Sequence, residues 1–340
     1  MDNLTNNANT LSTFDDESSL RRRIITILLL ITFSIPSLIC FLSIFYQFIQ
    51  LRKVLLFDRI NHHVIFCILI CDFLLISTEL PFSLVYLSLG HVPTIKLCTF
   101  WIYWDYTLET TSLFLTMYAS IERYLLVFHK ERFIKRKILC HYIPLTIACL
   151  YIPTLYVYFI VRFPCTEYQQ YNLTQFACGG ACYAYAFIET TYDTIANTMI
   201  PSFLLLIFNL LMIMRVILLK RKMSPTSSLS SNTWKKNRRM ILQLLSISLT
   251  CLITWMPWVV IIFVQDFYDS SFGQNFITVV LHYLPYFTSF LSPFLALIGL
   301  KEIRQKLRVK RSTATPNSIS ATAETAKNQK ILALNQLSRF

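Results

Sequence analysis

The sequence predicts an all-α integral membrane protein: a bundle of seven transmembrane helices followed by a short amphipathic eighth helix. Three observations lead to this fold class. Hydrophobic residues make up 55% of the 340 residues and charged residues only 14%, which is more apolar than a soluble domain. Apolar runs that can cross a bilayer as a helix, which takes about 20 residues, recur along the chain. Lys and Arg gather in alternate connections between these runs.

Seven apolar runs define the predicted spans, numbered one to seven in chain order. They cover residues 24–50, 62–89, 98–128, 138–161, 186–219, 240–265 and 275–300. The sequence contains no internal repeat, and its halves lack the matched broken spans of an inverted-repeat transporter. We therefore expect residues 24–300 to form a single bundle.

The two ends of the chain are predicted to lie on opposite sides of the membrane. Basic residues concentrate in loops 1–2, 3–4 and 5–6 and after span seven, so these segments are assigned to the cytoplasm. Residues 1–23 then form an extracellular amino-terminal tail, although Arg21–Arg23 depart from the charge pattern. Residues 301–311 alternate basic and apolar side chains, as in a helix on the inner membrane surface. The polar residues 312–340 are expected to be a disordered cytoplasmic tail.

The net charge of +13 raises the question of a nucleic-acid partner. The excess charge flanks the spans, where an anionic inner leaflet attracts it, so the expected partner is the lipid bilayer and no nucleic acid. Asn3 and Asn172 begin glycosylation sequons, and both fall on the side predicted to be extracellular.

Span three ends in an acid, a guanidinium and a phenol: Glu122, Arg123 and Tyr124. Charges at membrane depth are costly and need partners. Cys98 precedes Arg123 by 25 residues, a helical distance of about 37 Å, which is roughly one membrane thickness. The spacing places the cysteine and the charged triplet at opposite ends of one span.

This pattern resembles the rhodopsin-like (class A) G-protein-coupled receptors, whose third helix has the same cysteine and ends in Asp/Glu-Arg-Tyr. Further landmarks of that family lie in register: Asp72 in span two, Pro201 in span five, Trp255-Met256-Pro257 in span six and Pro293 in span seven. The resemblance covers residues 24–310. It implies a plasma-membrane receptor without enzymatic activity, whose Glu122, Arg123 and Tyr124 couple to a heterotrimeric G protein.

The chain departs from the family pattern at the signalling end. Span seven reads Ser292-Pro293-Phe294-Leu295-Ala296 in place of Asn-Pro-x-x-Tyr, and Asn209 replaces a tyrosine of span five. Span six has Asn237, Arg238 and Arg239 where relatives place an acid that locks the arginine. We therefore expect raised basal signalling.

The loop between spans four and five contains three cysteines: Cys165, Cys178 and Cys182. It is predicted to face an oxidising compartment, where disulfides persist. The resemblance implies that Cys98 pairs with Cys178 or Cys182, and the sequence leaves this choice open. A second bridge that uses Cys165 is an additional possibility.

Acidic residues are abundant in or near the outer parts of the spans. They are Asp72, Glu79, Asp105, Glu109, Glu189 and Asp193. Since each ionised carboxylate costs about 2.5–3.5 kcal/mol on the insertion scale, acids without protein partners predict a cationic ligand. Asp105 and Glu109 are four residues apart and share one helix face.

The resemblance assigns further ligand-binding residues. Asp105 occupies the position whose carboxylate binds the ammonium in amine receptors, and Tyr286 the position of a tyrosine that supports it. Asp193 and Asn197 lie where the fifth helix meets ligand. Independently of the resemblance, Trp255 is expected to line an aromatic floor with Trp258, Tyr106 and Phe287, which suits a cation as well as an apolar ligand. The expected ligand is an amine or a basic peptide.

The internal sodium site of the family is resembled by Asp72, Ser112, Ser289 and Ser292, so Na⁺ is the expected cofactor. Retinal is not expected, because span seven contains no lysine. The alternative function is a transporter or cation channel whose path the acids line. No continuous polar face runs along any one span, which favours the receptor.

Overall fold

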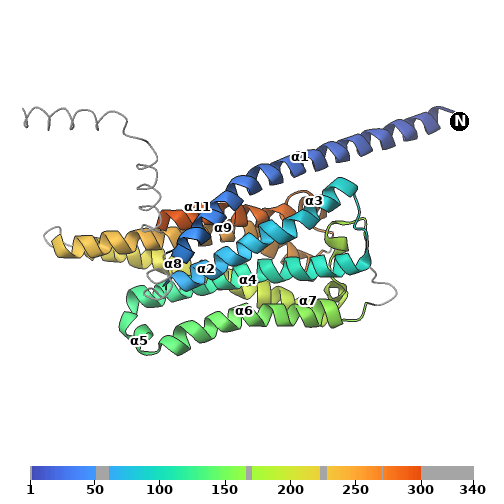
Figure 1. Ribbon diagram of the computed structural model, residues 1–340. Coiled ribbons are helices and arrows are strands. Elements are labelled where there is room, and N and C mark those ends of the chain that lie inside the picture. Colours follow the sequence, from blue (N-terminus) through green and yellow to red (C-terminus); the bar gives the residue numbers. More distant parts are fainter. Residues whose placement is uncertain (1, 51–60, 166–170, 223–227, 270, 300–340) are drawn as a thin grey trace, which may run out of the picture. The chain divides into compact units, whose positions relative to one another are not determined.

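The computed structural model describes residues 2–50, 61–165, 171–222, 228–269 and 271–299, all within the compact unit Met1–Gly299. Throughout these ranges the chain forms helices, turns and loops, without strands (Figure 1). The amphipathic helix predicted at 301–311 and the tail predicted at 312–340 lie outside the described residues.

The first two spans correspond to α1 and to a composite helix. Helix α1 (Asp2–Gln50) includes residues assigned to the tail as well as span one. The second span consists of α2 (Asn61–Leu74), the π-helical turn η2 (Leu75–Glu79) and α3 (Leu80–Leu89). Pro81 explains the wider turn, because its ring displaces the carbonyl one turn earlier. Gly90 ends α3 with a left-handed φ of 77°, which suits glycine.

Helix α4 (Ile95–Phe128) is 34 residues long and carries most of the predicted site residues. It begins at Thr94, whose side chain accepts a hydrogen bond from the Leu97 amide at 3.3 Å and so satisfies one of the free N–H groups of the first turn. The short helix α5 (Lys130–Lys135) follows.

The fourth and fifth spans also combine α-helix with π-helical turns. The fourth consists of η3 (Ile138–Tyr142), α6 (Ile143–Tyr156) and η4 (Val157–Arg162). A loop with two 3₁₀ turns, η5 (Phe176–Gly179) and η6 (Cys182–Tyr185), leads to the fifth span. This span consists of α7 (Phe187–Tyr192), η7 (Asp193–Met199) and α8 (Ile200–Lys222). Pro201 follows η7 as Pro81 follows η2.

The sixth span lies in α9 (Ser228–Phe267), which contains Pro257. The seventh was predicted as one helix over 275–300, but the structure divides it into α10 (Gln274–Val279), η8 (Leu281–Tyr283) and α11 (Leu284–Gly299). Pro285 gives the physical reason, since proline is favoured in the first turn of a new helix and disfavoured inside one.

Within the described residues, five segments are long and apolar enough to cross a membrane: Leu20–Gln50, His62–Leu89, Ile138–Arg162, Phe187–Leu218 and Leu245–Gln265. Helix α4 is long enough, at about 51 Å, but its acids and threonines lower its hydropathy. Helix α11 has 16 residues up to Gly299, where the described part of the chain ends.

Helix α4 is the centre of the packing. It contacts α2, α6, α8 and α9, while α11 lies against α9 and α1 (Figure 1). Leu113 of α4, Leu205 of α8 and Trp255 of α9 share one buried apolar cluster. Ser37 joins α1 to α11 through a 2.8 Å hydrogen bond to the Phe290 carbonyl. We call the end of α4 at Cys98 the disulfide end and the other the Arg123 end.

Candidate functional site

The buried carboxylate of Glu79 joins α3, α4 and α11 toward the disulfide end. Glu79 is fully buried at the end of η2. Its Oε1 accepts hydrogen bonds from Trp101 Nε1 at 2.7 Å and Ser83 Oγ at 3.2 Å, and its Oε2 accepts one from Tyr286 OH at 2.6 Å. The sequence placed Tyr286 in support of Asp105, but the structure directs its hydroxyl to Glu79. Glu79 is therefore satisfied within the protein.

Two further acids, both on α4, have different surroundings. Asp105 is 9% exposed, and Glu109, one turn further, is half-buried. Among the residues that the structure describes, neither carboxylate accepts a hydrogen bond or forms an ion pair. The charged groups that act on Asp105 are other acids, Glu109 and Glu79. Their negative charge is therefore not compensated by the described part of the protein.

Asp193, in η7, resembles Glu79 in its surroundings. Its Oδ1 accepts hydrogen bonds from Asn197 Nδ2 at 2.7 Å and Tyr156 OH at 3.1 Å, and its Oδ2 accepts one from Tyr183 OH at 2.6 Å. Burial, together with the Asp193 charge, raises the pKa of Tyr183 well above its usual value, so this loop hydroxyl stays protonated and donates. Asp193 and Asn197 are hydrogen-bonded to each other, and both bind other protein groups. Their predicted contact with ligand stays a prediction.

The loop between the fourth and fifth spans is held by two disulfides. Cys98 pairs with Cys178, which resolves the choice that the sequence left open, and Cys165 pairs with Cys182. Asn172, the second sequon residue, has an exposed side chain in this loop. The side chain of Asn3 lies outside the described residues, and glycosylation of both stays a prediction.

Phe176 brings this loop onto the bundle. Its ring lies 5.3 Å from Trp101 and 4.7 Å from His282, measured between centroids. The next two residues, Ala177 and Cys178, have left-handed φ values of 44° and 55° although both carry a Cβ. Such conformations persist only where surrounding structure holds them, and here the disulfide and the buried aromatic cluster do so.

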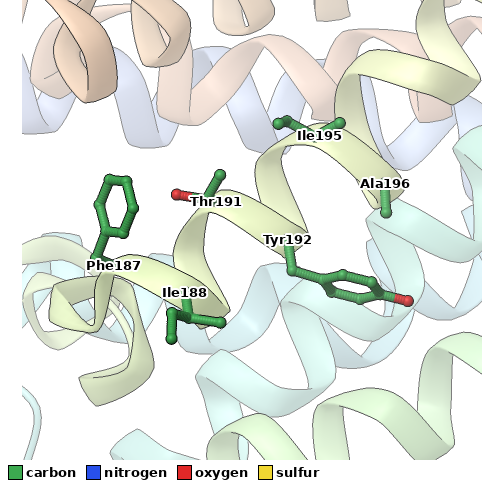
Figure 2. Close-up of a pocket in the computed structure, with 6 residues that line it drawn as sticks. All are labelled: Phe187, Ile188, Thr191, Tyr192, Ile195 and Ala196. Carbon is green, nitrogen blue, oxygen red and sulfur yellow. The ribbon is translucent and has the colours of Figure 1, made fainter.

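Trp255, the remaining predicted ligand residue, is 9% exposed and packs in the cluster with Leu113 and Leu205. A shallow pocket of about 400 Å³ lies elsewhere, on α7 and η7. Figure 2 shows its lining residues along one side of these turns: Phe187, Ile188, Thr191, Tyr192, Ile195 and Ala196. None of the predicted ligand-binding residues lines it.

Asp72 lies deep in the bundle on α2 and is 1% exposed. Its Oδ1 accepts hydrogen bonds from Ser112 Oγ at 2.9 Å and Ser289 Oγ at 3.4 Å. Its Oδ2 is buried without a hydrogen-bond partner in the described structure. Ser292, also predicted here, is 1% exposed. A buried carboxylate oxygen without a partner, near three serines, fits a small cation such as Na⁺.

At the Arg123 end, Glu122 and Arg123 are 1% and 2% exposed. The Glu122 carboxylate lies 2.7 Å from His141 Nδ1 in η3, and His141 Nε2 lies 3.0 Å from His63 Nδ1 in α2. Sequence reasoning missed both histidines. Their positions at the ends of spans two and four carried no signal for this contact, since they are 78 residues apart.

Tyr124 completes the predicted triplet. It is half-buried and packs against Phe128 of its own helix and Phe208 of α8. The side chains of Asn237–Arg239 lie outside the described residues, so the missing lock on span six stays a prediction.

The comparisons with known proteins agree with this arrangement. No curated protein matches the chain. A family model does, and it is described as 7 transmembrane receptor (rhodopsin family) and aligns with residues 59–295. These residues include Cys98, the Glu122–Tyr124 triplet, Trp255 and Pro293, and the match confirms the predicted family and the seven-helix bundle. The protein is a multi-pass membrane protein that belongs to the rhodopsin family of seven-transmembrane receptors.

Proposed function

We propose that this receptor binds a cationic extracellular ligand, an amine or a basic peptide, and passes the signal to heterotrimeric G proteins. The disulfide end then faces the outside of the plasma membrane and the Arg123 end the cytoplasm. Two features support this orientation. Lys and Arg are concentrated in the loops at the Arg123 end, and both disulfides, Cys98–Cys178 and Cys165–Cys182, lie at the opposite end. The amino terminus is then extracellular and the carboxyl terminus cytoplasmic.

The proposal of a cationic ligand rests on the surroundings of the Asp105 and Glu109 carboxylates. Glu79 and Asp193 each accept three hydrogen bonds from the protein, whereas the carboxylates of Asp105 and Glu109 accept none from the described residues. A carboxylate removed from water without a partner is costly. A bound cation removes that cost, so these two acids favour a positively charged ligand over a neutral or anionic one.

The Arg123 end supports the proposed coupling. A ligand that binds one arrangement of the bundle better than another shifts the population toward it. Pro257 and Pro293 lie inside the helices α9 and α11, and Pro201 lies at the junction of η7 and α8. Such points allow a helix to bend. The shift then changes the surroundings of Arg123 and Tyr124, which we propose contact the G protein.

The test is Asp105→Asn, which keeps the size of the side chain and removes its charge. Amines and basic peptides are first screened for activation of G-protein pathways. The potency of the best agonist should then fall by roughly 30-fold or more, or about 2 kcal/mol, because one partner of a desolvated ion pair is lost. Asp269→Asn is the matched control, since Asp269 is exposed in a loop and its carboxylate accepts hydrogen bonds from Ser271, its neighbour in that loop.

Glu109→Gln separates the two ligand classes. A small amine depends on Asp105 alone, whereas a peptide that carries Arg or Lys also weakens with Glu109→Gln. A neutral or anionic best agonist whose potency neither substitution alters would refute the cationic ligand.

We also propose that Asp72 holds Na⁺ together with Ser112, Ser289 and Ser292. The carboxylate would supply the charge and the hydroxyls neutral oxygen ligands. Replacing Na⁺ by a bulky organic cation at constant ionic strength should change agonist potency in the wild type and leave Asp72→Asn unaffected. An equal change in both proteins would argue against the site.

A further inference from the structure

Three polar side chains form a chain across the Arg123 end of the bundle. His141 and the Glu122 carboxylate meet at 2.7 Å, with both side chains at most 1% exposed. The other ring nitrogen of His141 meets His63 at 3.0 Å, and His63 is half-buried. The three residues come from α4, η3 and α2, so the chain joins three segments at the residue that precedes Arg123.

The contact between Glu122 and His141 shows which ring nitrogen of His141 carries a proton. An ionised carboxylate only accepts hydrogen bonds, so His141 Nδ1–H donates to Glu122. The backbone of η3 is anchored as well, because Tyr118 OH donates to the Cys140 carbonyl at 2.6 Å. The His141 ring also packs edge-on against Tyr142, with centroids 4.8 Å apart. His141 is therefore held in the orientation that binds Glu122.

Arg123 competes with His141 for the same carboxylate. It follows Glu122 directly, is almost fully buried, and its charge interacts with that of Glu122. In surroundings of low dielectric constant such an attraction is strong, and a carboxylate released by one partner turns to the other. In the structure, Glu122 Oε1 accepts the hydrogen bond of His141 Nδ1.

We propose that His141 is a positioning residue for G-protein coupling: by holding Glu122, it prevents this acid from locking the Arg123 guanidinium. This inference rests on the proposed function, in which Arg123 serves the G protein. It assigns to His141, in the fourth span, a role in the G-protein coupling of Arg123, in the third span.

Three substitutions separate positioning from simple packing. His141→Phe keeps a ring but removes both hydrogen bonds. His141→Asn places an amide N–H near the position of Nδ1 and so keeps the donor to Glu122. Glu122→Gln, added to His141→Phe, removes the charge that would lock Arg123. His91→Asn is the matched control, since His91 is exposed in the loop between α3 and α4.

The measurement is nucleotide exchange by purified heterotrimeric G proteins of each main class. Ligand-free receptor in lipid nanodiscs is compared with empty nanodiscs. His141→Phe should lower receptor-dependent exchange by about fivefold or more, a change that loss of one charge-assisted hydrogen bond can produce. His141→Asn and His91→Asn should stay near the wild type, and the double variant should exchange faster than His141→Phe alone. Wild-type exchange by His141→Phe, or exchange by the double variant as low as that of His141→Phe, overturns the inference.

A second measurement does not depend on a G protein. In thermal unfolding of the purified receptor, His141→Phe should lower Tm, and adding Glu122→Gln should recover part of the loss, because the acid without its partner is removed. Additive effects of the two substitutions overturn the inference. If wild-type receptor produces no exchange with any G protein, the proposed coupling is wrong and the inference falls with it, and the thermal comparison then reports only whether His141 holds Glu122.

Discussion

Four acids near the disulfide end form two contrasting pairs. Glu79 and Asp193 lie on π-helical turns and receive hydrogen bonds from tyrosine, tryptophan, serine or asparagine side chains. Asp105 and Glu109 lie on a regular stretch of α4 and accept no hydrogen bond from the described residues. The residue type is the same in both pairs. The difference supports the proposal that the first pair stabilises the fold and the second pair binds the ligand.

The largest expected effect is on Glu79. Glu79→Ala removes the acceptor of Trp101 Nε1, Ser83 Oγ and Tyr286 OH. The two hydroxyls lie 2.7 Å apart and can then bond to each other, which leaves two of the three donors without an acceptor. Buried donors without acceptors cost about 1–3 kcal/mol each, so the free energy of unfolding should fall by roughly 3 kcal/mol or more. Thermal unfolding of purified receptor measures this. Glu189→Ala is the control, since its carboxylate has no hydrogen bond in the described residues, and an equal loss there would break the comparison.

Asp193→Ala should have a smaller effect of the same kind, about 2 kcal/mol, because Asp193 is half-buried whereas Glu79 is fully buried. Tyr156 also has a second partner in Thr110 at 3.1 Å. The loss should also release Tyr183 and make the loop 163–186 more sensitive to protease. Limited proteolysis with and without the substitution measures this. Unchanged cleavage together with unchanged stability would show that Asp193 does not stabilise the fold and would group it with Asp105 and Glu109.

Much of the helical framework was predictable because it depends on local composition. The predicted spans 62–89 and 138–161 correspond to His62–Leu89 and Ile138–Arg162 in the structure. Hydropathy alone did not reveal the break before α11, where Pro285 starts a new helix, or the π-helical turns that precede Pro81 and Pro201. These depend on backbone geometry around single prolines.

Which of the candidate residues bind ligand stays a prediction, and their hydrogen bonds could not be predicted from the sequence. The four-residue spacing from Asp105 added Glu109, and the resemblance to the receptor family named Asp105, Asp193 and Tyr286. Neither could reveal that Tyr286 bonds to Glu79, since these residues are 207 positions apart. The partner of Cys98 was left open for the same reason, because the path of the loop decides it. Which acid is satisfied depends on distant donors, and no local pattern contains that information.

The most direct test of the contrast needs no ligand. The melting temperature Tm of purified, ligand-free receptor is compared for Asp105→Asn, Glu109→Gln and Glu79→Gln, each of which replaces an acid by its amide. Glu79→Gln should lower Tm by several degrees, because the amide introduces a donor where three donors already converge. Asp105→Asn and Glu109→Gln should keep or raise Tm, because each removes a charge that the described protein leaves uncompensated. A fall in Tm for Asp105→Asn as large as that for Glu79→Gln would show that Asp105 stabilises the fold, and would contradict the account.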